Sequence, residues 1–381
     1  MKRTLPLVIA FFISCSAFAS ITLTLHMSFQ DTTRSFLVHF PTGFSNSQHV
    51  PVVINMHGSG SDGAEEEFYS RMSETSDSNH FMVVYPDGID KVWNSGFTPP
   101  YNSDPDDVGF VGKIIDTLYT LYNVDLTRVY ATGMSNGGFQ SYRLACDLEN
   151  RIAAIASVAG AITDLTALNC VLSRKIPVME IHGTADPLVP YGGETGIKSV
   201  EETLNFFLNL DQCSSVNDTV QWPDLDPTDS STVQRIHYAS CGSGTEVMFF
   251  KITGGGHTWP NAYYPYIYGP TNHDLDASQE IWNFFNRFTI NGPTAVQEVK
   301  NELEVTVSPN PGNGNYQLSI TTHQAEQPLN VFVFDVTGKK VFEQKIFSST
   351  TALNLTGVEA GIYIMKLEGK DIATTKRIAK E

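Results

Sequence analysis

The sequence predicts an α/β fold, with a mostly parallel sheet flanked by helices, followed by a small all-β sandwich. Short apolar runs alternate with helical patterns through most of the 381 residues, as is typical of a parallel sheet covered on both faces. A polar linker begins near residue 291, and beyond residue 303 alternating apolar residues and turns replace the helices. A chain of this length has room for two domains.

The N-terminus has the features of a secretory signal. Lys2 and Arg3 precede an apolar run over residues 5–13, and the segment ends in Ala17-Phe18-Ala19, an A-x-A cleavage site. We expect a signal peptide over residues 1–19. Cys15 lies inside it, but Phe12 stands where lipoprotein signals usually have leucine, which argues against lipidation. We expect no membrane-spanning segment in the remainder.

Export changes the interpretation of the cysteines and the charge. Removal of the signal peptide, and Cys15 with it, leaves Cys146, Cys170, Cys213 and Cys241. An even number of cysteines in an oxidising compartment favours two disulfides over a metal site. Loss of Lys2 and Arg3 takes the formal net charge from −17 to −19. Such an acidic chain is a poor partner for nucleic acid or an anionic membrane.

The expected elements of the first domain follow one another in a largely βα order. The strands are expected at residues 21–25, 35–39, 51–56, 81–85, 129–131, 152–158, 176–181 and 246–252. The helices are expected at residues 64–75, 106–122, 140–146, 200–208 and 276–288. The first two strands form an antiparallel hairpin at the sheet edge. Ser199 and Glu202 have the spacing of a capping box.

The stretch from Arg128 to Phe139 contains the pattern G-x-S-x-G, centred on Ser135. A strand precedes it and a helix follows, and Gly133 and Gly137 allow the sharp turn that exposes a nucleophilic serine. The motif alone also fits an ordinary loop. Its interpretation therefore depends on a base and an acid elsewhere in the chain.

Two later strand ends supply such partners. Asp186 follows the strand at 176–181, and His257 follows the strand at 246–252 after three glycines. The order serine, acid, histidine, each after a strand, is that of the α/β-hydrolase fold. His57 and His182 are expected to brace loops instead.

Two further loops are candidates for the walls of the site. The segment His57-Gly58-Ser59-Gly60 follows a buried strand, where α/β-hydrolases place half of their oxyanion hole; an ordinary strand-to-helix turn is the alternative. The irregular segment 86–105 contains Trp93, Asn94, Phe97 and Tyr101, which suit either a substrate cleft or buried anchors. We interpret Asp106 and Asp107 as helix capping residues rather than a metal or acid–base site.

Five motifs together resemble the esterase family that groups poly(3-hydroxybutyrate) depolymerases with feruloyl and acetylxylan esterases. They are Trp93-Asn94 and the segments 106–110, 128–138, 182–186 and 255–260. The resemblance covers residues 21–290. It implies Ser135 as nucleophile, Asp186 and His257 as its partners, and the backbone N–H groups of Asn136 and Ser59 as the oxyanion hole.

The tail is similar to the C-terminal sorting domain of the type IX secretion system. The similarity rests on segments 307–311, 333–339 and 360–363, and it implies export across the outer membrane through that machinery. The expected organisation is a signal peptide (1–19), a hydrolase domain (20–290), a linker (291–302) and a sorting domain (303–381). Of three possible disulfide connectivities we expect Cys146–Cys170 and Cys213–Cys241, because each closes a short loop; the esterase resemblance supports this pairing.

These observations predict a secreted or cell-surface serine carboxylesterase that needs no metal or organic cofactor. Its expected substrates are polymer-linked feruloyl or acetyl esters of polysaccharides, and a polyester such as polyhydroxybutyrate is the alternative. Trp93, Tyr191 and Trp259, with Phe97, are candidate substrate contacts that could equally pack the loops. A non-catalytic glycan-binding protein on the same fold, or a peptidase, are the other classes to test.

Overall fold

The computed structural model describes residues 19–97, 105–263, 268–293, 305–320, 329–335, 339–368 and 373–380. The predicted signal peptide up to Phe18, Tyr101 of the long loop and most of the expected linker lie outside the described residues. The chain divides into two compact units, Met1–Thr294 and Ala295–Glu381. Within the described ranges, no helix combines the length and apolar character that a membrane span requires.

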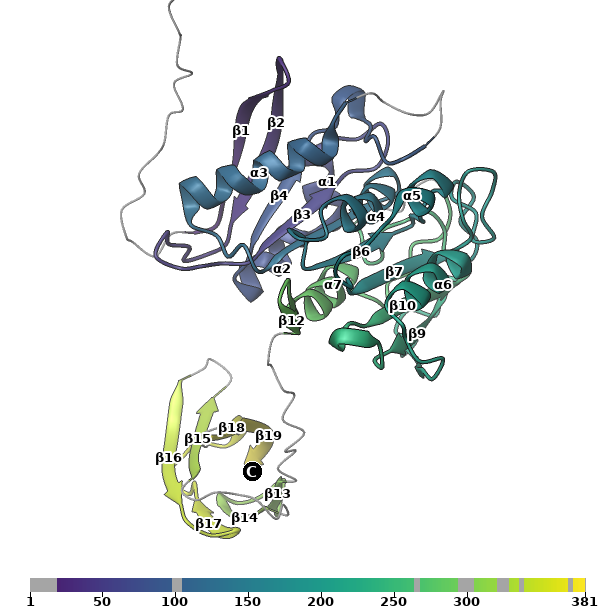
Figure 1. Ribbon diagram of the computed structural model, residues 1–381. Coiled ribbons are helices and arrows are strands. Elements are labelled where there is room, and N and C mark those ends of the chain that lie inside the picture. Colours follow the sequence, from purple (N-terminus) through teal and green to yellow (C-terminus); the bar gives the residue numbers. More distant parts are fainter. Residues whose placement is uncertain are drawn as a thin grey trace, which may run out of the picture. The chain divides into compact units, whose positions relative to one another are not determined.

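The first unit is built on a ten-stranded sheet in the order β1-β2-β4-β3-β5-β6-β7-β10-β9-β8 (Figure 1). Its strands are β1 (Ile21–Phe29), β2 (Thr32–Phe40), β3 (Val52–Met56), β4 (Met82–Pro86), β5 (Val129–Met134), β6 (Ala154–Val158), β7 (Val178–Gly183), β8 (Asp218–Gln221), β9 (Thr232–Tyr238) and β10 (Val247–Thr253). From β4 to β10 in this order neighbouring strands run parallel, and β1, β2, β9 and β8 form antiparallel edges. The predicted α/β class and the edge hairpin are confirmed.

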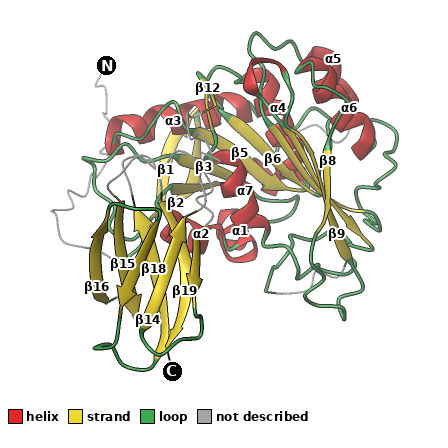
Figure 2. Cartoon of the chain, turned by 90° about the horizontal axis from the view of Figure 1, so that it is seen from below, coloured by secondary structure: helices red, strands yellow, loops and turns green. Residues whose placement is uncertain are grey.

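Helices cover both faces of this sheet (Figure 2). They are α1 (Gly63–Ser70), α2 (Met72–Asn79), α3 (Asp107–Tyr122), α4 (Asn136–Asp147), α5 (Asp164–Asn169), α6 (Val200–Leu210) and α7 (Ala277–Phe285), with short 3-10 turns at Ile89–Lys91 and Gly242–Gly244. Alternate strand residues serve the two faces: Val52 and Ile54 pack in the cluster that contains α3, α4 and α6, whereas Val53 packs in the cluster with α2 and α7.

The sequence predicted several helix termini correctly and one helix incorrectly. The Asp106 side chain caps α3 by accepting from Gly109 N–H, and Ser199 and Glu202 form the expected capping box. The single helix expected at 64–75 is instead broken at Arg71, which adopts a left-handed conformation with φ of 57°. The break buries Met72 completely against the sheet. Helix α5 and the edge strands β8 and β9 were not predicted.

The second unit is a β-sandwich, as predicted. One sheet holds β13 (Val305–Ser308), β14 (Asn315–Ile320) and β17 (Thr350–Asn354), and the other holds β16 (Lys340–Ile346), β15 (Leu329–Asp335), β18 (Gly361–Glu368) and β19 (Ala373–Lys380). The expected alternation is present, because Tyr316, Leu318 and Ile320 are buried while their neighbours are more exposed. Both sheets contribute to one apolar core. In the first unit, a short pair, β11 (Phe288–Thr289) and β12 (Gly292–Pro293), follows α7.

Candidate active site

Ser135 lies in the turn between β5 and α4, at the carboxyl end of the parallel strands. Its backbone has φ of 54° and ψ of −118°, a conformation that is costly for a residue with a side chain. Gly133 and Gly137 make the turn possible, because a Cβ on either would overlap the backbone carbonyl of Met56 at the end of β3. Residues with such strain concentrate at functional sites.

Asp186 and His257 come together from loops after neighbouring parallel strands, β7 and β10. His257 Nδ1 lies 2.7 Å from Asp186 Oδ2. The other carboxylate oxygen, Oδ1, accepts from the N–H groups of Leu188 and Val189, each at 2.8 Å. Both side chains are almost completely buried. The carboxylate is thus fixed by its own loop before it meets the imidazole, whose Nε2 is left for another partner.

One cavity, with a volume of about 470 Å³, is lined by both Ser135 and His257. Gly58, Ser59 and Gly60 also line it, and Gly58 lies so close to Ser135 that an added Cβ would be 3.5 Å from the serine Cβ. The structure therefore brings Ser135, His257 and Ser59 to one space, with Asp186 behind His257. Asn136, the first residue of α4, is adjacent to Ser135 in the chain.

The cavity wall contains an acid that the sequence did not single out. Glu66 on α1 is only 2% exposed, and its Oε1 has no hydrogen-bond partner. Burial raises the pKa of the Glu66 carboxyl well above its usual range, and the Asn55 side chain offsets part of the shift. The run Glu65-Glu66-Glu67 gives no sequence signal of which acid is buried.

The aromatic residues expected to contact substrate occupy other positions. Trp93 and Trp259 are each 1% exposed, and neither is among the residues that line the cavity. Tyr191 packs against Phe249 and has Lys251 Nζ 5.2 Å from its ring centroid, and it is not among the residues that line the cavity. Phe97 packs edge-on against Phe139. The geometry therefore favours loop packing over substrate contact for these rings, and Phe68, Tyr69 and Tyr268 line the cavity instead.

The two histidines expected to brace loops do so. His57 Nε2 accepts from Gly88 N–H at 2.9 Å and its Nδ1 lies 2.7 Å from the Gly58 carbonyl oxygen; burial lowers the pKa of His57 and favours its neutral form. His182 joins Glu180 at 2.9 Å and the Val189 carbonyl at 3.0 Å. Burial by itself would lower the pKa of His182, but the pairing with Glu180 raises it overall.

Both expected disulfides, Cys146–Cys170 and Cys213–Cys241, are present. The first ties the end of α4 to the end of α5. It therefore anchors the far end of the helix that begins beside Ser135.

A serine on a strained strand-to-helix turn over a parallel sheet, with an aspartate and a histidine after later strands, defines the α/β-hydrolase class. The chain is 29% identical over 273 residues to a protein described as an esterase, NocK of Nocardia uniformis subsp. tsuyamanensis, covering 66% of this chain and 79% of the relative. It is 26% identical to the bifunctional acetylxylan esterase/xylanase XynS20E of Neocallimastix patriciarum and 28% identical to feruloyl esterase B of Piromyces equi.

Those two matches cover 75% and 59% of this chain, but only 38% and 42% of the relatives' own length. Among solved structures, an acetyl xylan esterase from Aspergillus awamori aligns with a TM-score of 0.48 at 13% identity, over 69% of this chain and 98% of that one. Residues 306–381 match the family described as secretion system C-terminal sorting domain. The chain is thus a homologue of carboxylic ester hydrolases that carries a sorting domain of type IX secretion, which points to an extracellular or cell-surface location.

Proposed function

We propose that the chain hydrolyses esters through Ser135, His257 and Asp186. His257 Nε2 accepts the proton of Ser135 as Oγ bonds to the ester carbonyl carbon, and Asp186 stabilises the imidazolium that forms. His257 then protonates the departing alcohol, which leaves an acyl-enzyme. Water repeats the cycle and releases the acid. The observation that carries this proposal is the shared cavity of Ser135 and His257, with Asp186 bound to the far nitrogen of the imidazole.

In the same mechanism the backbone N–H groups of Ser59 and Asn136 form the oxyanion hole. The negative charge that develops on the carbonyl oxygen needs donors already in place, and loss of one such donor costs about 3–4 kcal/mol of barrier. Ser59 lines the cavity and Asn136 begins the helix beside it. The N-terminal end of α4 adds a favourable dipole at this point.

The proposed substrates are feruloyl or acetyl esters carried by polysaccharides. The relatives named as acetylxylan and feruloyl esterases support this choice, and the aromatic side chains of the cavity wall suit a ring or a sugar face. We further propose that residues 20–290 form the catalytic domain and 303–381 the sorting domain. Export then begins with cleavage after Ala19 and ends with passage across the outer membrane.

One panel tests the proposal: methyl ferulate, acetylated xylan and a polyhydroxybutyrate suspension at equal enzyme. We expect release of ferulate or acetate by the parent and none above background by Ser135→Ala. Ser141→Ala is the matched control, since its hydroxyl bonds to the Gly137 carbonyl within α4 and should be dispensable for turnover. Clearing of the suspension alone would favour a polyester depolymerase. Binding of xylan without hydrolysis of any ester would favour a glycan-binding protein.

A further inference from the structure

The two proposed oxyanion donors belong to separate loops that follow the paired strands β3 and β5, so their spacing depends on that pairing and on any residue that contacts both loops. Ser59 follows β3, whereas Asn136 begins α4 after β5. A backbone N–H stabilises an oxyanion only when it is within about 3 Å of the charge. Small changes in the relative position of these loops would therefore lower the rate.

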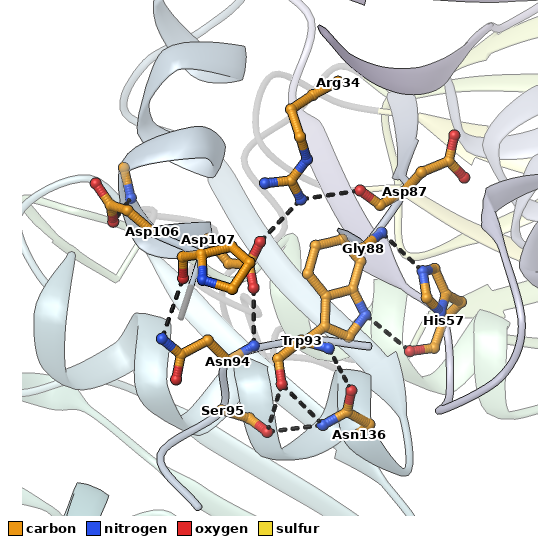
Figure 3. Close-up of polar contacts among 12 residues, drawn as sticks. Arg34, His57, Asp87, Gly88, Trp93, Asn94, Ser95, Asp106, Asp107 and Asn136 are labelled. Atoms are coloured by element: carbon orange, nitrogen blue, oxygen red, sulfur yellow. Dashed lines mark hydrogen bonds and ion pairs between the residues drawn. The ribbon is translucent and has the colours of Figure 1, made fainter. Parts of the chain in front are cut away.

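Trp93 is bonded to both loops (Figure 3). Its indole Nε1–H donates to the carbonyl oxygen of His57 at 2.9 Å, two residues before Ser59. Its backbone N–H donates to Asn136 Oδ1 at 2.6 Å, and Asn136 Nδ2 donates back to the Trp93 carbonyl at 3.3 Å and to Ser95 Oγ at 2.7 Å. The Asn136 side chain thus serves Trp93 and Ser95, and one tryptophan bridges the two loops.

The position of Trp93 is itself fixed from two sides. Its ring packs against the His57 ring, with centroids 4.9 Å apart, and the side chain is 1% exposed. The next residue, Asn94, donates its backbone N–H to Asp107 Oδ2 at 2.8 Å. A bridge that moved freely could not set a spacing, and these contacts hold Trp93 in place.

Asp107 is held in turn by a buried ion pair. Arg34 on β2 donates to Asp107 Oδ1 at 2.8 Å and to the Asp87 carbonyl at 2.9 Å (Figure 3). Arg34 is 3% exposed and lies 3.9 Å from the centroid of the Phe110 ring. The interpretation of Asp107 as only a capping residue is therefore incomplete. A continuous set of bonds runs from the sheet edge to both loops of the hole.

We propose that Trp93 is a positioning residue that holds the Ser59 and Asn136 loops at the separation the oxyanion requires. The proposal rests on the proposed function. It differs from a substrate-contact role, because Trp93 does not line the cavity, and from a purely structural role, because its bonds end on the two loops that carry the donors. A positioning role predicts a loss in kcat with KM nearly unchanged, since only the transition state carries the oxyanion.

Trp93→Phe tests this, because it removes the indole N–H while keeping a smaller aromatic ring, and the matched control below accounts for the lost ring volume. We expect kcat for methyl ferulate, or for whichever ester the parent cleaves, to fall by about 100-fold, the effect of misplacing catalytic groups by about an ångström. The matched control is Trp222→Phe. The Nε1–H of Trp222 also donates to a backbone carbonyl, that of Asp274 at 3.2 Å, but Trp222 lies near the β8 edge. The control should keep the parent kcat.

Inhibition by phenylboronic acid gives the second readout, because its tetrahedral adduct with a serine mimics the oxyanion. Its Ki should rise in Trp93→Phe by the same factor as kcat/KM falls, and should not change in Trp222→Phe. Asn136→Ala removes the other half of the bridge while keeping the Asn136 backbone N–H, and should reproduce the effect if Trp93→Phe does not fold.

The proposal is wrong if folded Trp93→Phe has a lower Tm but an unchanged kcat, or if both bridge variants raise KM and leave kcat intact. A parent that cleaves no ester would instead contradict the proposed function. The two failures are therefore distinguishable.

Discussion

The aspartate that faces His257 makes three hydrogen bonds, and replacement by asparagine alters one of them selectively. Oδ1 of Asp186 accepts from two backbone N–H groups, and Oδ2 faces His257 Nδ1 at 2.7 Å. An asparagine has a single acceptor oxygen, which must face the two N–H groups. Its NH₂ group then points at Nδ1, so this nitrogen must accept and the ring proton moves to Nε2, the nitrogen left for Ser135. The imidazole can no longer act as a base.

We therefore expect Asp186→Asn to lower kcat by about 10⁴-fold, the effect of the wrong tautomer in a serine protease triad, or about 5.5 kcal/mol of barrier. The number of hydrogen bonds is preserved, so any change in Tm should come mainly from loss of the charge that faces His182 Nε2 at 3.6 Å. The assay is kcat for a small activated ester from pH 5 to 9, with Tm measured in parallel. Asp186→Asn with a kcat within tenfold of the parent would refute the assignment of Asp186 as the orienting acid.

Three further predictions concern stability and domain organisation. Because burial raises the pKa of Glu66 above its unfolded value, the unfolded state binds fewer protons above about pH 4.5, and stability falls as pH rises to the folded pKa. Urea unfolding at several pH values should therefore show that the free energy of unfolding of Glu66→Gln rises relative to that of the parent as pH rises. The increase should be at most about 1.4 kcal/mol per pH unit. A difference in free energy that does not change with pH would contradict this. Joint replacement of Cys146 and Cys170 by alanine should cost about 3–4 kcal/mol in the same assay, since the bridge spans a sequence separation of 24, and a loss below 1 kcal/mol would argue against it. A chain ending at Pro293 should keep full activity on a soluble ester, because it retains β12 and the bond from Ile290 N–H to the Thr127 carbonyl. If this truncated chain folds but is inactive, the sandwich contributes to the site.

The elements that sequence predicted correctly, and the residues proposed as the triad, have local signals. Ser135, Asp186 and His257 each follow an apolar strand and stand beside glycines, which report the backbone turn directly. The paired Asp106 and Asp107 likewise identified the start of α3. Both disulfides close loops short enough to be inferred from spacing and resemblance.

What sequence missed depends on contacts between distant residues. Arg34 and Asp107 are separated by 73 positions, and nothing near either of them indicates the other. The aromatic character of Trp93 suggested a cleft, but whether such a ring faces substrate or the core is decided by the loop carbonyl that accepts its N–H. The break at Arg71 has a similar cause, since burial of Met72 outweighs the continuity of a weakly apolar helix.

The charge on the cavity wall also depends on how deeply a side chain is buried. In the proposed mechanism an oxyanion forms within the space that Glu66 lines, and an ionised carboxylate there would repel it. The structure prevents this by burial: the Oε1 atom has no hydrogen-bond partner, so ionisation is costly and the acid stays protonated up to its raised pKa. The overall negative charge of the chain is a weaker influence, because exposed charges farther than about 10 Å are largely screened by salt. Burial of the Glu66 carboxyl therefore removes one negative charge from a cavity wall that also includes the exposed Glu65.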